Sequence, residues 1–257
     1  MRLVDQIGNT IRLDKPAQRI VSIVPSQTEF LHDIDLDDEV VGITKFCIHP
    51  KAWFQSKNRV GGTKNVDLEK VRALNPDLII ANKEENDKEN IAELRKIAPV
   101  YMSDIFNLDD SFEMMRQIGE LTNRKEESQF IIEKIKDNFR SLKPFSSIKK
   151  ALYFIWREPW MLAGKSTFID SILDKWGLEN AIGVERYPVV EIENLPACDF
   201  VLLSSEPYPF KEKHIAEIRK QLPLAKVMLV DGEIFSWYGS RLLKAPEYLN
   251  NLKNQLS

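Results

Sequence analysis

The stretch Glu126–Leu142, EESQFIIEKIKDNFRSL, decides how the rest of the chain is interpreted. Four of its apolar residues, spaced four, four and three apart, share one face of a helix: Ile131, Ile135, Phe139 and Leu142. Pro144 follows, and Thr122 and Asn123 are candidate caps for the other end. We therefore expect a helix of about 20 residues, roughly 30 Å long, near the midpoint of the chain.

Composition limits the class of protein. The chain has 257 residues with a net charge of −3, so its overall charge favours no nucleic acid partner. Cys47 and Cys198 are far apart and have no metal-type spacing, so we expect free thiols. No apolar run is long enough for a membrane span, and the first residues lack the apolar core of a signal peptide. The chain is therefore expected to be cytosolic or to be missing its leader.

Strands alternate with helices before the central helix. Arg2–Leu13 alternates around a turn at Gly8, which predicts a β-hairpin. Strands are expected at Arg19–Val24, Glu39–Thr44, Asp77–Ala81 and Val100–Ser103. Ser26 and Glu29 have capping-box spacing at the start of a helix, whereas the segment 46–55 is expected to be irregular. Such alternation indicates parallel βαβ units.

The pattern begins again after the central helix. Strands are expected at Lys150–Trp156, Phe200–Ser204 and Lys226–Val230, with helices between them and a C-terminal helix at Leu242–Leu256. Val66–Glu69 precedes a short helix and a strand, and Val190–Glu193 does the same 124 positions later, although its strand follows at an offset of 122. We therefore predict an α/β fold of two Rossmann-like lobes with central parallel sheets, residues 1–122 and 145–257. One backbone helix, 123–144, would join them, with the ligand cleft between the lobes.

Catalytic motifs are absent from the sequence. There is no Gly-x-Ser-x-Gly elbow, no Gly-x-Gly-x-x-Gly and no Walker loop. His49 is the only histidine expected in a loop, and a single histidine does not make a metal site. We therefore expect neither a catalytic residue nor a bound metal ion.

Aromatic and arginine residues gather just after the predicted strands. They are Phe46 and Trp53, the segment Trp156–Trp160 with Arg157, Tyr208–Phe210, and Phe235–Arg241 with Trp237 and Tyr238. In open α/β sheets, ligands bind outside the carboxyl ends of the strands. Flat aromatic rings and arginine suit a bulky, partly polar small molecule. Some of these rings could instead belong to the core, and Arg241 could cap the C-terminal helix.

Glu69 and Glu193 occupy matching positions of the repeat. Each lies in the first turn of a predicted helix, where a carboxylate stabilises the helix dipole. Alternatively, the two carboxylates could dock on a basic, two-fold symmetric partner.

The chain resembles the solute-binding proteins of metal-chelate ABC importers, the helical-backbone metal receptors. The resemblance rests on RIVSIVPSQTE, VGGTKNVDLEKVRALNPDLIIA, the central helix, VVEIENLPACDFVLL and FSWYGSR, in that order along nearly the whole chain. TKNVDLE and FSWYGSR most resemble the vitamin B12-binding members. The resemblance implies little closure on binding, and delivery to a dimeric ABC permease that docks on Glu69 and Glu193.

The resemblance also implies a set of ligand-binding residues: Ser26, Thr28, Phe46, His49, Thr63, Lys64, Trp156, Arg157, Trp160, Tyr187, Trp237, Tyr238 and Arg241. The expected ligand is a cobalt or iron chelate, with cobalamin first, and the protein has no cofactor of its own. Thr63 stands where cobalamin binders carry an aromatic residue, and Lys64 follows it, which leaves room for a ferric siderophore or haem.

The resemblance further implies a monomer in the periplasm or cell envelope, with a cytoplasmic location as the alternative. Two other functions remain open at this point. One is a cytosolic metallocofactor-handling enzyme that uses His49 and Glu84, and the other is a structural or sensor protein that binds a peptide.

Overall fold

The computed structural model describes residues 1–256, which fold into two compact units. Unit 1 contains Met1–Ile105, Asp109–Lys136 and Tyr238–Arg241, and unit 2 contains Phe106–Leu108, Asp137–Trp237 and the chain from Leu242 onward. Two short segments, Phe106–Leu108 and Tyr238–Arg241, belong to a different unit from the residues on either side of them, and the boundary at Lys136 falls within the segment predicted as the joining helix.

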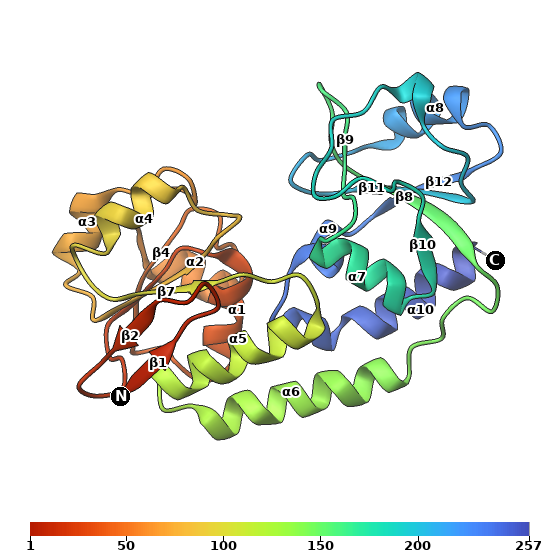
Figure 1. The fold of residues 1–257 in the computed structure, drawn as a ribbon. Helices are drawn as coiled ribbons and strands as arrows, with labels where there is room; N and C mark the ends of the chain where they lie inside the picture. Colours follow the sequence, from red (N-terminus) through yellow and green to blue (C-terminus); the bar gives the residue numbers. More distant parts are fainter. Residues whose placement is uncertain (257) are drawn as a thin grey trace. The chain divides into compact units, whose positions relative to one another are not determined.

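Unit 1 is built on a five-stranded parallel sheet of order β5-β4-β3-β6-β7 (Figure 1). Its strands are β3 (Ile20–Ser22), β4 (Val40–Ile43), β5 (Asn58–Arg59), β6 (Leu78–Asn82) and β7 (Val100–Ser103). Its helices are α1 (Pro25–Asp33), α2 (Lys51–Ser56), α3 (Leu68–Ala73), α4 (Lys88–Leu94) and α5 (Leu108–Leu121), the last beginning in unit 2. The predicted hairpin is confirmed as β1 (Arg2–Val4) and β2 (Thr10–Arg12).

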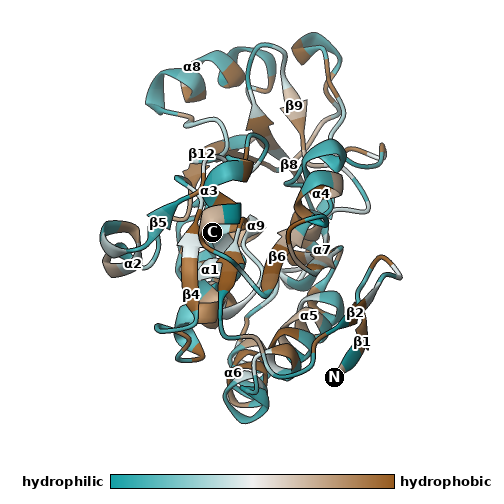
Figure 2. Ribbon diagram, turned by 90° about the vertical axis from the view of Figure 1, so that its left-hand side faces the viewer, coloured by the Kyte–Doolittle hydropathy of each residue, from teal (hydrophilic) through white to brown (hydrophobic). Residues whose placement is uncertain are grey.

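The core of unit 1 forms because the central strands are apolar on both faces, as Figure 2 shows for β4 and β6. On one face, Val71 of α3 and Leu94 of α4 pack against Val21 and Ile79 of the sheet, and all four side chains are fully buried.

Unit 2 repeats the strand order of unit 1. Its strands are β8 (Lys149–Trp156), β9 (Met161–Leu162), β10 (Leu178–Asn180), β11 (Phe200–Ser204) and β12 (Lys226–Val230). The parallel strands run in the order β10-β8-β11-β12, and β9 pairs antiparallel with β8. When the short edge strand β5 is left out, the unit 1 strands run β4-β3-β6-β7. In chain order they then lie second, first, third and fourth in their sheet, as β8, β10, β11 and β12 do in theirs. This shared order agrees with the predicted repeat.

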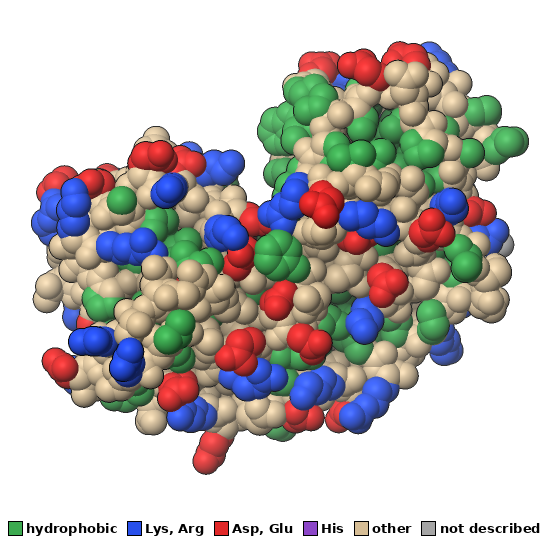
Figure 3. All heavy atoms as spheres, viewed as in Figure 1, with side chains coloured by type: hydrophobic (Ala, Val, Ile, Leu, Met, Phe, Trp, Pro, Cys, Tyr) green, Lys and Arg blue, Asp and Glu red, His purple; other side chains and the backbone are tan. Residues whose placement is uncertain are grey.

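The helices of unit 2 are α7 (Phe168–Lys175), α8 (Glu212–Gln221), α9 (Gly232–Ser236) and α10 (Ala245–Leu256). A 3₁₀ turn, η1 (Ile192–Asn194), stands where a short α-helix was predicted, and a second, η2 (Ser240–Leu243), precedes α10. Hydrophobic side chains gather on the surface of the upper part of unit 2 in Figure 3.

The central helix, α6, spans Lys125–Arg140 and is shorter than predicted. Its buried face includes Ile131 and Ile135 of the predicted set, together with Ile132, whereas Phe139 is half-buried and Leu142 lies beyond the end of the helix. The predicted caps are wrong. Thr122 Oγ1 donates back to the carbonyl of Ile118, and Asn123 has a φ of +58° in the turn before α6. Within residues 1–256, no helix combines the length and the apolar character needed to cross a membrane.

Two further local predictions are wrong. The segment that was expected to be irregular contains α2, whose Trp53 is buried. The capping box of α1 does not form, because Pro25 begins the helix and the carboxylate of Glu29 pairs with Arg241 instead. The strands β5, β9 and β10 were not predicted because two or three residues are too few for a periodic signal.

Candidate functional site

The loop after β4 offers the most exposed aromatic ring at the carboxyl edge of the unit 1 sheet. Phe46 is 51% exposed, and Lys45 Nζ lies 5.1 Å from the centroid of its ring. Thr63, half-buried, and Lys64, exposed, follow β5, the neighbouring strand. This edge therefore presents an exposed aromatic ring with one lysine beside it and a second lysine in the loop after the neighbouring strand, a combination that suits a flat or anionic molecule.

A buried polar cluster holds the Phe46 loop. Thr28 Oγ1 lies 2.8 Å from Ser22 Oγ and 3.1 Å from Cys47 Sγ, and Thr44 Oγ1 lies 3.2 Å from the same sulfur. Burial raises the pKa of the Cys47 thiol, so the group stays protonated and can donate to a threonine oxygen. Thr28, predicted to bind ligand, is fully buried in this cluster and supports the loop, and Ser26 is buried as well.

A second buried network positions the loops after β5 and β6, and sequence reasoning missed it. Asn86 Nδ2 donates to the carbonyl of Thr63 at 2.8 Å, and Asn86 Oδ1 accepts from the amide of Asn82 at 2.8 Å. Asn82 Oδ1 accepts from the amides of Glu84 and Glu85 at 2.8 and 3.2 Å. The only signal in the sequence was a polar residue ending an otherwise apolar strand.

His49 is half-buried and immediately precedes Pro50. Across residues 1–256, no group of three or more His, Cys, Asp and Glu side chains is arranged to hold a metal ion. The residues described therefore offer no multidentate site for a bare cation.

In unit 2, the last residue of β8, Trp156, is 39% exposed. Its ring meets Tyr208 edge-on, with centroids 5.8 Å apart. Arg157 pairs with both carboxylate oxygens of Glu217, at 3.2 and 3.0 Å, and lies over the ring of Trp160. Trp156 is thus the exposed member of this group, while Arg157 and Trp160 are engaged in packing.

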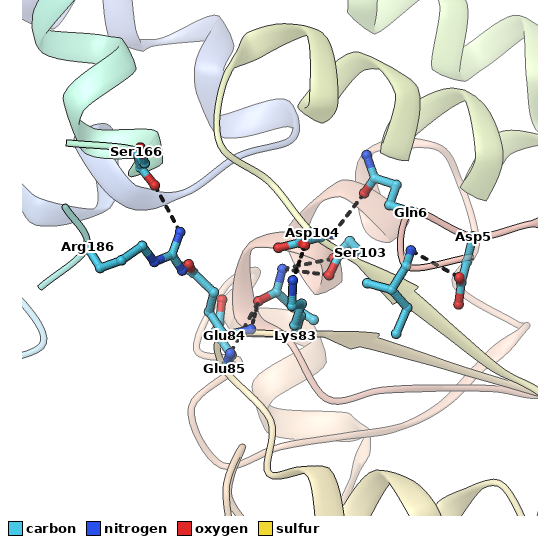
Figure 4. Close-up of polar contacts among 11 residues, drawn as sticks. Asp5, Gln6, Lys83, Glu84, Glu85, Ser103, Asp104, Ser166 and Arg186 are labelled. Atoms are coloured by element: carbon cyan, nitrogen blue, oxygen red, sulfur yellow. Dashed lines mark hydrogen bonds and ion pairs between the residues drawn. The ribbon is translucent and has the colours of Figure 1, made fainter. Parts of the chain in front are cut away.

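Tyr187 is half-buried, and the guanidinium of its neighbour Arg186 lies 5.7 Å from its ring centroid. Arg186 also donates to the carbonyl of Ser166 at 2.9 Å, as Figure 4 shows. These contacts within unit 2 hold the segment that carries Tyr187.

The three predicted residues of the FSWYGSR segment are all buried. In unit 2, the indole N–H of Trp237 donates to Glu206 Oε1 at 2.8 Å. Burial raises the pKa of Glu206, and the bonds from Ser236 and Trp237 oppose that rise.

In unit 1, the hydroxyl of Tyr238 lies 3.1 Å from Glu85 Oε1, and Arg241 makes two 2.8 Å bonds to the carboxylate of Glu29. Arg241 is therefore held by a buried ion pair, and the alternative of a helix cap is not observed. Most of the surface of these three side chains is already in contact with protein.

The two matched carboxylates occupy similar places in the two units. Glu69 lies in the first turn of α3, is 83% exposed and pairs with Arg72 of the same helix. Glu193 lies in η1 and is exposed. Each precedes the equivalent strand of its sheet, β6 in unit 1 and β11 in unit 2, so the repeat places one exposed carboxylate on each unit.

Comparison with known proteins agrees with this architecture. A curated relative, the vitamin B12-binding protein of Vibrio parahaemolyticus, is 23% identical over 188 residues, which cover 71% of this chain and 68% of the relative. An uncharacterized ABC transporter substrate-binding lipoprotein of Bacillus subtilis, YvrC, is 26% identical over 69% of this chain and 59% of its own length.

A solved structure, the periplasmic heme-binding protein HutB of Vibrio cholerae, has the same fold. It superposes with a TM-score of 0.76 at 19% identity, over 92% of this chain and 98% of that one. The family model for periplasmic binding proteins matches residues 20–199, from β3 to the residue before β11. The chain therefore belongs to the periplasmic binding protein family.

Proposed function

We propose that this protein is the substrate-binding component of an ABC importer, which captures a metal chelate and delivers it to a membrane permease. Such a component would work outside the cytoplasmic membrane. The observation that carries the proposal is the repeat itself. Each α/β unit has loops at the carboxyl edge of its sheet and one exposed carboxylate before the equivalent strand, β6 or β11.

The ligand would be held by the exposed rings at the two carboxyl edges. Phe46 in unit 1 and Trp156 in unit 2 are the rings with most surface left for a ligand. A corrin or a porphyrin is wide and flat, and aromatic plates bind such molecules with little loss of side-chain entropy. Each ring would contribute by stacking, and the buried networks behind the loops would keep the rings in place.

Cobalamin is the favoured cargo because the curated relative from Vibrio parahaemolyticus is a vitamin B12-binding protein. The alternative is an anionic chelate such as haem or a ferric siderophore. Lys45 and Lys64 favour it, since Lys45 adjoins Phe46, Lys64 lies in the loop after the neighbouring strand β5, and neither has a carboxylate partner within residues 1–256. The two cargoes differ in charge, so salt should weaken binding of the anionic chelate more.

Docking on the permease would use Glu69 and Glu193. Both carboxylates are exposed, and a dimeric permease offers two equivalent basic patches. The contact of Glu69 with Arg72 is a surface pair of small free energy, so it would not prevent exchange for a partner's arginine.

A direct test is to incubate the purified protein with cyanocobalamin, haemin or a ferric siderophore, remove free ligand, and record the visible spectrum. We expect one coloured ligand to be retained. Turnover of a ligand would favour the metallocofactor-handling enzyme, and failure to retain any of the three would contradict the proposed cargo class.

The docking proposal is tested separately, with the double variant Glu69→Ala and Glu193→Ala. We expect normal ligand binding and reduced uptake by the reconstituted importer. A matched control is Glu126→Ala and Glu127→Ala in the first turn of α6, two exposed glutamates outside the repeat positions, which should leave uptake unchanged. Normal uptake with the first pair would remove the docking role.

A further inference from the structure

The N-terminal hairpin is fastened to the free edge of the unit 1 sheet by side chains. Asp5 Oδ2 accepts from the amide of Met102 at 3.2 Å, and Gln6 Oε1 accepts from the amide of Asp104 at 3.1 Å. Figure 4 shows Gln6 reaching Asp104 in this way. Asp5 also accepts from the amides of Ile7 and Asn9 in the hairpin turn. The hairpin thus covers the carboxyl end of the β7 edge.

The other end of the same edge is not paired. Ile79 donates to the carbonyl of Pro99, and Lys83 donates to that of Ser103, so these odd-numbered residues of β7 face β6. The even-numbered residues therefore face outward. The amides of Met102 and Asp104 are bonded to the hairpin, but within residues 1–256 the amide of Val100 has no hydrogen-bond partner.

The hairpin has a free edge as well. Met1 and Leu13 exchange both of their backbone hydrogen bonds, at 2.7 and 3.1 Å. In an antiparallel pair, bonded and non-bonded residue pairs alternate. The backbone groups of Thr10 and Arg12 consequently point away from β1.

A groove of about 790 Å³ brings these free backbone groups together. Its walls are Gly8–Arg12 from the turn and β2, and Arg95–Val100 from the end of α4 and the start of β7. An unpaired strand edge binds an added strand readily, because main-chain groups on both sides need partners. The groove is therefore shaped for a short extended chain.

Positive charge is concentrated at this groove. Among the nine arginines of unit 1, three have neither a carboxylate, a carbonyl nor a ring partner within the described residues: Arg2, Arg12 and Arg95. Arg12 and Arg95 line the groove, and Arg2 is the cross-strand partner of Arg12. No carboxylate lines it.

The cross-strand pair of Arg2 and Arg12 is the feature that local structure does not explain. Arg95 and Lys96 follow α4, where cations stabilise the end of a helix, and Lys96 pairs with Glu93. Two like charges directly opposite on a hairpin, by contrast, oppose its folding. An anionic partner would offset this repulsion, because its negative charges would attract both arginines.

We propose that this groove binds an extended, acidic polypeptide segment of a partner protein, which adds as a strand at the edge of β2 and β7. The backbone of the segment would bond to Thr10, Arg12 and Val100. Its carboxylates would meet Arg12 and Arg95, and long side chains would reach Arg2. The site lies wholly in unit 1 and does not depend on the identity of the imported ligand.

The test uses two heptapeptides with blocked ends, one alternating glutamate and valine and the other alternating lysine and valine. Titrations of the isotope-labelled protein would be followed by amide NMR shifts and by hydrogen exchange. We expect only the acidic peptide to bind, with shifts at Thr10, Arg12 and Val100, slower exchange of those amides, and weaker binding at higher salt.

Charge reversal supplies the matched variants. R12E and R95E should each weaken binding of the acidic peptide at least tenfold, whereas Lys51→Glu, on exposed α2 away from the groove, should leave it unchanged. Binding of the imported chelate should be the same in all three variants.

Several outcomes would overturn the proposal: no binding of the acidic peptide, equal binding of the lysine peptide, or shifts that map outside the groove. Sedimentation with vesicles that contain phosphatidylglycerol covers the other anionic partner. If vesicles but not the peptide retain the protein, and R12E abolishes retention, the groove faces a membrane surface and the peptide proposal is wrong.

Discussion

Units 1 and 2 share one strand order, but they cover the equivalent face of the sheet differently. In unit 1, α3 and α4 bury most of the apolar residues on this face, and only Val41, Leu68, Leu74 and Ile97 stay partly exposed. In unit 2, as many apolar residues on this face are partly buried as are fully buried, among them Val190, Ile192 and Leu195 around η1. The two units therefore have equivalent sheets, but the segments that cover this face of the sheet differ between them.

Chain length explains the change. The offset between the repeats falls from 124 to 122 between Glu193 and Asp199, so unit 2 has two residues fewer than unit 1 in which to build a helix. Pro196 removes a further backbone donor at this point. Two residues are more than half a helical turn. What remains is one 3₁₀ turn that cannot cover the sheet.

The largest expected effect on stability comes from removing the arginine that makes two bonds to one carboxylate in each unit. Arg241→Ala should destabilise the protein by about 3–5 kcal/mol, because Glu29 would keep a buried charge without its partner. Arg157→Ala removes the half-exposed pair with Glu217 in unit 2 and should cost at most about 1 kcal/mol. Urea unfolding of both variants measures the difference. Equal losses would show that burial does not separate the two pairs.

The next largest effect on stability is expected from replacing Glu206 in unit 2. Glu206→Ala should cost about 1–3 kcal/mol, because the indole N–H of Trp237 and the hydroxyl of Ser236 lose their acceptor. Glu206→Gln keeps an acceptor oxygen and serves as the control. Thermal unfolding of the three proteins measures the ranking, and an unchanged Ala variant would mean that these bonds contribute nothing.

The pH dependence at Glu206 has a definite sign. Burial raises the pKa of Glu206 in the folded state above its usual 4.5. The stability that this group contributes is therefore fully present below the unfolded pKa, and it is lost as the pH rises through the folded pKa. Wild type should lose stability relative to Glu206→Gln as the pH increases from 4 toward 8.

Ligand binding tests whether both units contribute. Phe46→Ala and Trp156→Ala should each weaken binding of the true ligand about tenfold, or about 1.4 kcal/mol, because each removes an exposed plate. Phe130→Ala is the control, since that ring is 61% exposed on α6, outside the carboxyl-edge loops. Calorimetric titration measures the affinities. A loss confined to one variant would show that only the ring of that unit contacts the ligand.

Helix capping gives the smallest effect. Asp67 accepts from the amide of Lys70 and caps α3, whereas Glu191 at the matching position of unit 2 makes no capping bond. Asp67→Ala should speed hydrogen exchange in α3, and Glu191→Ala should leave exchange in η1 unchanged. The bond from the Lys70 amide lowers the pKa of Asp67, so the advantage of wild type over Asp67→Ala should shrink as the pH falls through that lowered pKa. Equal changes in both units would contradict the comparison.

Several features could be predicted from the sequence because they depend on neighbouring residues. Apolar spacing and chain order predict the strand cores, such as Phe200–Ser204, and the buried face of α6. They also predict that Phe46 and Trp156 lie at the carboxyl ends of strands. The change of offset from 124 to 122 indicates the shorter cover of unit 2, but a short helix was predicted there and a 3₁₀ turn is found. Local periodicity determines which segments form strands and helices, and it determines which loops follow the strands.

Only the tertiary structure decided what the loop side chains touch. The indole N–H of Trp237 is bonded to Glu206, 31 positions away, and Arg241 pairs with Glu29 across 212 positions. The assignment of Tyr238–Arg241 to unit 1, and the arrangement of free strand edges and arginines at the hairpin groove, are equally long-range. Such partners follow from how the chain packs in space, and no spacing along the sequence encodes them.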